Sequence, residues 1–355
     1  MIKQMVIAAG GQSSRIKEDL DLNHNKCFIC SQGLPIIYHT IDMAKRAGVD
    51  EFFISVDNNS RPILEEVLED LNLNATIAPP ANSFLNVPSK FYNRLDEIFF
   101  LICGNQPCPD THFIEMNEKL NFGTNIATVY PAKILPDRLK KRIILINEDN
   151  GLYGQVDNTP FDSWYVSSPY LVSKDLLLES RLDESSLSEL FFERNDLNDP
   201  LYVVKTSMPR EFDYDGELVR TMIYLNSIKL KTQYNKNRTF LNKIDRLRMK
   251  GRYARLSHMF RVIGDRVFDR AIEIGCKKAF LLHNIHAREK IGYDLSPYKA
   301  YPGIEYRIHD VTSPINEQAD LVICSEVIEH IANFEAVLNN SYQALNKGGI
   351  LFLTT

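Results

Sequence analysis

The stretch Met5-Val-Ile-Ala-Ala-Gly-Gly-Gln-Ser-Ser-Arg15 joins a short apolar run directly to a turn that contains two glycines and ends in a cation. The run 5–9 has the length and composition of a buried strand. Glycines allow positive φ angles and let backbone N–H groups approach an anion closely. The stretch therefore predicts a phosphate-binding loop at the carboxyl end of a first strand.

The chain beyond this loop alternates between strand-like and helix-like segments. Strands are predicted at 51–56, 75–78, 98–103, 125–130, 142–146, 164–172 and 201–205, and helices at 35–48, 61–71, 110–120 and 217–228. The alternation restarts after residue 270, with strands predicted at 271–274, 290–294, 305–308, 321–324 and 350–354. This pattern is typical of mostly parallel sheets covered by helices.

The change in composition between the two series indicates two domains. Residues 229–254 are rich in Lys and Arg, interleaved with apolar residues. We predict an α/β protein with two Rossmann-like three-layer α/β/α domains, 1–228 and 255–355, joined by this basic helical linker. A basic helix could contact nucleic acid or a membrane surface, but a solvated face is the favoured interpretation.

The overall composition excludes several classes of protein. The 355 residues are 44% hydrophobic and 25% charged, with a net charge of −5, so no global charge favours nucleic acid. The sequence contains no apolar run of about 18 residues that could span a membrane, and its start lacks a signal peptide. We expect a cytoplasmic protein. The Cys27 and Cys30 pair has no partner pair at zinc spacing, which favours reduced thiols over a metal site.

Two cations accompany the glycine turn. Arg15 and Lys26 could offset the charge of a triphosphate and the charge that develops at the attacked phosphorus. The arrangement resembles the GGxxxR…PK signature of the GT-A-like nucleotidyltransferases, which include cytidylyltransferases. The resemblance implies that Arg15 and Lys26 are catalytic, that CTP is the preferred nucleotide, and that the loop holds the NTP with Ala8, Ala9, Gly10, Gly11, Gln12, Ser13 and Ser14.

A magnesium site is implied by the same resemblance. The turn 104–107 occupies the place of an acidic turn in the family, but here it contributes Asn105 to nucleotide binding, which brings no charge. Asp213 and Asp215 resemble the late acidic segment of the family and are the predicted Mg²⁺ ligands. A solvated turn and helix cap is the alternative interpretation of this pair. Because Asp213 and Asp215 also form a DxD, a GT-A glycosyltransferase is an alternative function.

The second half carries five motifs in the order found in class I S-adenosylmethionine-dependent methyltransferases, which it resembles over about residues 255–355. They are Ala271-Ile-Glu-Ile-Gly-Cys276, Gly292-Tyr-Asp294, His309-Asp310-Val311, the segment 320–330 and the segment 345–354. The resemblance implies that Glu273 and Gly275 flank the methionine part of S-adenosylmethionine and that Asp294 binds its ribose. It further places Asp310 by the adenine and Glu326 under the cofactor.

The second half also departs from that family. Lys277 and Ala279 stand where the family has glycines. If these positions need positive φ, each costs about 1–2 kcal/mol, which would weaken cofactor binding about tenfold per position. A non-catalytic nucleotide- or cofactor-binding module is therefore another alternative.

The sequence stops at the end of the fifth predicted strand of the second half. We expect it to be part of a longer bifunctional protein, or an oligomer in which another chain covers that strand. The combined expectation is an enzyme that transfers NMP to a small phosphorylated or acidic sugar-like metabolite with release of pyrophosphate. It would be fused to a methyltransferase module and would serve the synthesis of surface glycans or capsules.

Overall fold

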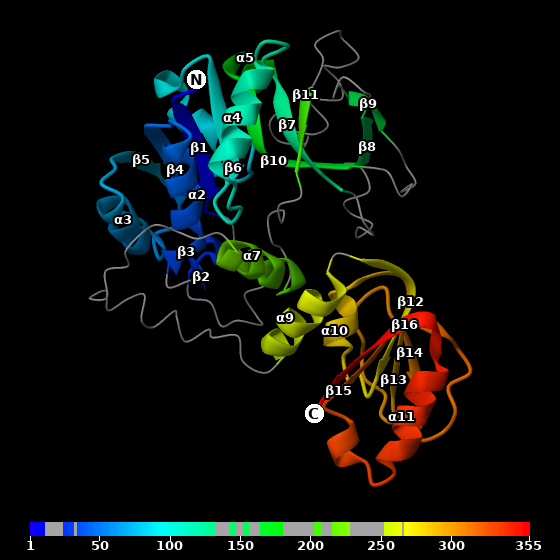
Figure 1. Cartoon of the computed structure of the whole chain (residues 1–355). Helices are drawn as coiled ribbons and strands as arrows, with labels where there is room; N and C mark the ends of the chain where they lie inside the picture. The colour runs from blue at the N-terminus through cyan, green and yellow to red at the C-terminus, as the bar shows by residue number, and fades with distance from the viewer. Residues whose placement is uncertain are drawn as a thin grey trace. The chain divides into compact units, whose positions relative to one another are not determined.

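The computed structural model describes residues 1–10, 24–31, 34–131, 143–146, 152–155, 164–179, 202–206, 215–227, 252–264 and 266–355. The chain forms two compact units, Met1–Arg248 and Met249–Thr355. Each unit has its own sheet with helices packed on it, as Figure 1 shows. The predicted α/β class is confirmed.

The first unit is built on a mixed nine-stranded sheet. Its main path runs β11-β7-β10-β6-β1-β4-β5, and β8 and β9 extend from β10. The strands are β1 (Gln4–Ala9), β4 (Glu51–Val56), β5 (Ala75–Ala78), β6 (Ile98–Cys103), β7 (Ile126–Pro131), β8 (Ile143–Ile146), β9 (Leu152–Gln155), β10 (Trp164–Ser173) and β11 (Tyr202–Lys205). Strand β1 is parallel to both β4 and β6, whereas β10 is antiparallel to β6, β7 and β8. The expectation of mostly parallel strands thus holds for β5, β4, β1 and β6. The rest of the sheet is mixed, because β10 is antiparallel to its neighbours.

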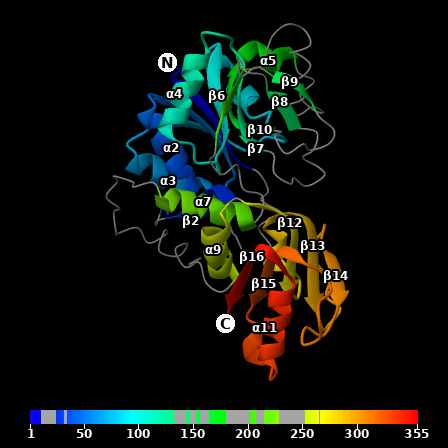
Figure 2. The ribbon, with the colours of Figure 1, turned by 45° about the vertical axis from the view of Figure 1, so that its right-hand side comes forward.

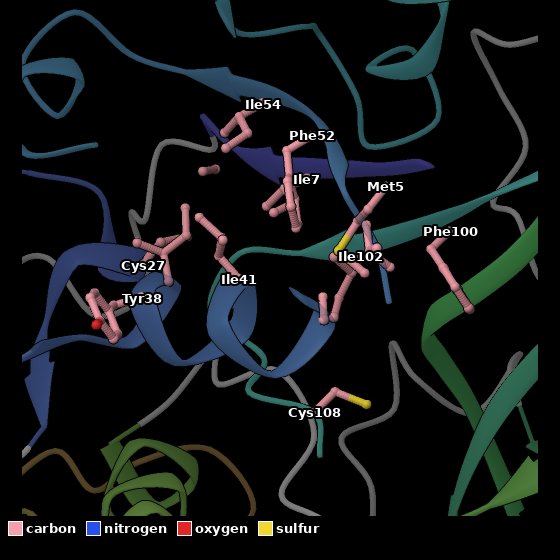
Figure 3. Packing of buried hydrophobic residues seen from close by; sticks show 14 of the residues in the cluster. Met5, Ile7, Cys27, Tyr38, Ile41, Phe52, Ile54, Phe100, Ile102 and Cys108 are labelled. Atoms are coloured by element: carbon pink, nitrogen blue, oxygen red, sulfur yellow. The ribbon is translucent and has the colours of Figure 1, made fainter. Parts of the chain in front are cut away.

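Apolar side chains alternate between the two faces of β1, as the two-residue period of a strand requires. Met5 and Ile7 belong to one buried cluster and Val6 to another. Helices α2 (Ile36–Arg46), α3 (Arg61–Asp70) and α4 (Asp110–Lys119) cover the first face, and η2 (Pro88–Arg94) and α5 (Lys174–Glu179) cover the second. In Figure 3, Ile41 of α2 lies opposite Ile7 and Ile54.

A further helix packs against the outer side of α2. It is α7 (Asp215–Ser227), and its Leu218 and Leu225 share a buried cluster with Ile36, Met43 and Ile29. This cluster fixes the start of α7 near the segment that precedes α2.

The second unit has a five-stranded, fully parallel sheet in the order β14-β13-β12-β15-β16. Its elements are α9 (Arg252–Ile263), β12 (Val267–Ile274), α10 (Phe280–His283), β13 (His286–Asp294), β14 (Glu305–Ile308), β15 (Ala319–Ser325), η4 (Ile328–His330), α11 (Phe334–Gln343) and β16 (Leu345–Thr354). Numbered along the chain, the strands lie in the order 3-2-1-4-5, which is a doubly wound arrangement. The order of the strands reverses between β12 and β15.

The faces of this second sheet are covered by different helices. Ile272 and Ile274 pack in a cluster with Val337 of α11. Glu273, which points to the opposite face, bonds to the backbone of α10. Figure 1 shows α9 and α11 on opposite sides of the sheet, and Figure 2 shows the same unit turned by 45°. None of the helices within the described ranges is long and apolar enough to cross a membrane.

Candidate functional site

The first candidate site lies where the strand order of the first sheet reverses. From β1 the chain passes to β4 on one side, and β6 lies on the other. Gly104 N, just after β6, donates a 2.9 Å hydrogen bond to Ala8 O. The loops that leave β1 and β6 therefore begin side by side, at the carboxyl ends where open α/β sheets bind ligands.

Both glycines at this edge lie in close packing. A Cβ on Gly10 would lie 2.9 Å from Cβ and Cγ of Pro80. A Cβ on Gly104 would lie 3.1 Å from Cys27 Sγ and 3.2 Å from Ala9 Cβ. Larger side chains would push these segments apart, so the glycines keep the edge compact.

Lys26 is brought to the same edge by its neighbours. It opens the short helix η1 (Lys26–Phe28), and the next residue, Cys27, is buried against Gly104. Asn25 caps η1 by accepting a 3.0 Å bond from Cys27 N, and Asn25 N donates to Ser60 Oγ at 2.9 Å. Ser60 in turn donates to Asp57 Oδ2 at 2.8 Å, just beyond β4. The half-buried Lys26 is thus anchored beside the ends of β4 and β6.

Asn105 lies between two fixed neighbours. It is 2% exposed, and Gln106, which follows it, is fully buried. Gln106 is bonded to side chains of β7 and β10, so the structure places the turn after β6 firmly against the sheet.

Several predicted site residues lie outside the described residues. These are Gly11, Gln12, Ser13, Ser14, Arg15 and Asp213. Asp215 is the first residue of α7, and only its backbone is described.

Among the described residues no three His, Cys, Asp or Glu side chains form a metal-binding group. Mg²⁺ in nucleotide sites is usually held by one or two carboxylates together with substrate phosphates. The magnesium ligands Asp213 and Asp215 therefore stay predictions of the sequence.

The second candidate site lies at the corresponding edge of the second sheet. The turn after β12 contains Gly275 at φ +64°, Lys277 at φ +47° and Ala279 at φ +59°. Both positions where glycines were expected therefore need the left-handed conformation, in which a side chain is costly. A Cβ on Gly275 would lie 2.5 Å from Val327 Cγ2. The backbone of this turn thus comes very close to the segment after β15.

Asp294 and Glu326 border this turn. Asp294, at the end of β13, accepts a 2.8 Å bond from Lys277 N and a 3.2 Å bond from Ser296 N. Glu326, just after β15, adopts φ +56° and pairs with Arg255 of α9 at 3.5 Å. Three of the four described non-glycine residues with positive φ therefore lie at this edge, and such clustering is typical of functional sites.

Arg255 was not predicted as a site residue; it is the first residue of the second predicted domain, directly after the basic stretch 229–254. Its pairing with Glu326 depends on the fold, and no local motif indicates it.

Asp310, after β14, is exposed and accepts two bonds from Thr312, which lower its pKa. Since β13 lies between β14 and β12, Asp310 is farther from the glycine turn than Asp294.

Glu273 is a buried acid directly before this turn. It is 6% exposed, and its Oε2 accepts a 2.9 Å bond from Leu282 N. Burial raises its pKa to about 8, although the Leu282 bond and the charge of Arg255 act in the opposite direction. Near neutral pH the side chain is therefore largely protonated.

Replacement of Glu273 by glutamine should change how stability depends on pH. Between the ordinary pKa of 4.5 and about 8, the folded state binds more protons than the unfolded state, so stability falls as pH rises. At about 1.4 kcal/mol per unit, this loss is on the order of a few kcal/mol. Glu273→Gln can keep the Leu282 bond and should flatten the fall. Urea unfolding at several pH values measures it, with the exposed Glu335→Gln as control; an equally steep fall in Glu273→Gln would contradict the assignment.

Comparison with known proteins assigns the second unit. Residues 236–355 match the family model described as "Methyltransferase domain". This part of the chain is a methyltransferase domain. Over 55 residues the chain is 44% identical to the mitochondrial ubiquinone biosynthesis O-methyltransferase of Rattus norvegicus and 38% identical to that of Mus musculus. The aligned stretch spans only 16% and 15% of the length of these two relatives.

The fold of the first unit is that of the nucleotidyltransferases. The inositol-1-phosphate CTP transferase from T. maritima matches 65% of this chain and 98% of its own, with a TM-score of 0.51 and 17% identity. A protein from Bacillus anthracis assigned as a glucose-1-phosphate thymidylyltransferase matches 64% and 97%, with a TM-score of 0.54 and 13% identity. At these identities the likeness establishes the fold alone. The predicted combination of a nucleotidyltransferase fold with a methyltransferase domain is confirmed.

Proposed function

We propose that the first unit transfers a nucleoside monophosphate from an NTP, preferably CTP, to a small phosphorylated or acidic acceptor. The observation that carries the proposal is the meeting of Gly10, Gly104 and the segment of Lys26 at one sheet edge. Two proteins of the same fold are named for reactions of inositol 1-phosphate and glucose 1-phosphate, which supports a sugar-like phosphate as acceptor. Such a product would suit the synthesis of surface glycans.

Nucleotidyl transfer requires that the acceptor and the NTP are positioned in line and that the negative charge on the phosphates is offset. An acceptor oxygen attacks the α-phosphorus in line, the new O–P bond forms, and the bond to the leaving pyrophosphate breaks. The Lys26 ammonium would offset the negative charge that develops on the phosphoryl oxygens, together with Arg15. Mg²⁺, when bound near Asn105, Asp213 and Asp215, would neutralise further phosphate charge.

Pyrophosphate release tests this proposal. The chain is incubated with Mg²⁺, each of CTP, GTP, UTP and ATP, and a panel of sugar and polyol phosphates. We expect release with one nucleotide, and a loss of about 10²–10³-fold in turnover for Arg15→Ala, the range for removal of one donor to the transition state. Unaltered turnover in Arg15→Ala would contradict the role of that residue. Cleavage of nucleotide sugars without pyrophosphate release would instead indicate a glycosyltransferase.

We further propose that the methyltransferase domain binds S-adenosylmethionine, which would supply the methyl group. The glycine at 275 lets the backbone of the turn approach Val327 closely, and the Asp294 carboxylate at the end of β13 can accept bonds from ribose hydroxyls. Calorimetric titration of the chain with S-adenosylmethionine tests the assignment. An absence of binding heat, with a folded protein, would contradict it.

A further inference from the structure

Gln106 occupies an unusual place next to the proposed nucleotide edge. It is fully buried, as are its partners Ser168 on β10 and Tyr130 on β7 at 2% and 3% exposure. Burial of a primary amide is costly unless its donors and acceptors are paired. The hydrogen-bond partners of the Gln106 amide therefore show what its side chain holds in place.

The side chain of Gln106 closes a ring of hydrogen bonds. Its Nε2 donates to the Tyr130 hydroxyl, and its Oε1 accepts from Ser168 Oγ. The Tyr130 hydroxyl donates onward to Ser168 O at 2.7 Å. Ser168 Oγ also accepts from Cys103 N, the last residue of β6, at 3.3 Å. Each of the three side chains thus donates one hydrogen bond to an acceptor within the ring, so the ring specifies one position of the amide.

The backbone around Gln106 is fixed as well. Gln106 O accepts a 3.2 Å bond from Thr40 Oγ1 of α2, and Gln106 N donates to Cys103 O at 3.1 Å. On the other side of Asn105, Gly104 N is bonded to Ala8 O. The two residues that flank Asn105 are therefore held by β1, β6, β7, β10 and α2.

We propose that Gln106 is a positioning residue for nucleotide binding: its buried ring holds Gly104 and Asn105 at the edge where the NTP is bound. The inference rests on the proposed nucleotidyl transfer by the first unit. Gln106 has no contact with the ligand in this role. It acts through the two residues that precede it, whose displacement by even a fraction of an ångström would misplace the phosphate-binding edge.

The test compares variants of the full chain that lose similar buried bonds. Gln106→Met removes the amide, so the Ser168 hydroxyl loses its acceptor and the Tyr130 hydroxyl loses its donor. Ser168→Ala removes one bond of the ring. Thr128→Val is the matched control: Thr128 Oγ1 donates to Pro169 O at 2.8 Å and is 2.8 Å from His112 Nε2, so these buried bonds go to β10 and α4 and not to Gln106. Each variant is assayed for kcat/KM in pyrophosphate release and for the Kd of CTP with Mg²⁺ by calorimetry.

We expect Gln106→Met to weaken CTP binding and lower kcat/KM about 10- to 100-fold, as found for residues that orient ligand-binding groups. Ser168→Ala should show a smaller loss in both quantities. Thr128→Val should lower the melting temperature without changing the Kd. Equal effects of Gln106→Met and Thr128→Val on the Kd would overturn the positioning role while leaving nucleotidyl transfer intact. If the unmodified chain neither binds nor turns over any NTP, both proposals fail.

Discussion

Replacing Lys26 by methionine should reduce nucleotidyl transfer about 10²- to 10³-fold, because the proposed mechanism would lose one of the two cations that offset charge on the phosphoryl group. Methionine keeps most of the length of the side chain, and Cys27 still packs on Gly104 and Asn25 still caps η1. The fold should therefore be retained. Steady-state pyrophosphate release with saturating NTP measures the effect on kcat.

The control for Lys26 is Lys90→Met. Lys90 is an exposed lysine on η2, which covers the opposite face of the sheet. Substitutions at such surface positions usually change stability by no more than about 0.5 kcal/mol. Lys90→Met should keep the turnover of the unmodified chain. If both variants lost the same activity, the effect would be one of overall charge, and the assignment of Lys26 would be wrong.

Replacing Gly275 by alanine should destabilise the methyltransferase domain by about 2–5 kcal/mol. A residue with a Cβ at φ +64° costs about 1–2 kcal/mol. The new methyl group would also lie 2.5 Å from Val327 Cγ2, and overpacking of this kind costs about 1–3 kcal/mol. Urea unfolding followed by circular dichroism measures the loss.

Gly303→Ala separates the two causes. Gly303 has φ +78°, but nothing lies within 4 Å of the position of its added Cβ. It should therefore show the conformational cost alone. The double variant Gly275→Ala, Val327→Ala should recover part of the steric cost relative to Gly275→Ala. Equal destabilisation by Gly275→Ala and Gly303→Ala would show that Val327 does not crowd the turn.

The sequence was most informative where one strand leads directly into a turn. The apolar run before Gly10 and the run before Gly275 predicted β1 and β12 because their period and their glycines indicate the same local structure. The condition stated for Lys277 and Ala279 is met, since both adopt positive φ; the weaker cofactor binding that would follow stays a prediction. Backbone conformation at such turns depends on neighbours a few residues away, which explains this success.

Contacts between distant segments could not be predicted in this way. Nothing in the local sequence shows that β10 enters the first sheet antiparallel to β6, because strand direction is set by how the whole sheet assembles. The pairing of Arg255 with Glu326 joins residues far apart in the chain, and the same is true of Gln106 and Ser168. The roles of Arg15, Asp213 and the loop from Gly11 to Ser14 remain predictions of the sequence.

The ring around Gln106 also affects the order in which the first unit folds. Ser168 is separated from Gln106 by 62 positions along the chain, and Tyr130 by 24. Contacts of long sequence separation form late in folding, because closing the intervening loops costs entropy before the contacts can repay it. A nascent chain still lacking β10 can therefore build β1, β4 and β6 but has no Ser168 to close the ring. On the proposed function, the nucleotide edge is complete only when β10 joins the sheet.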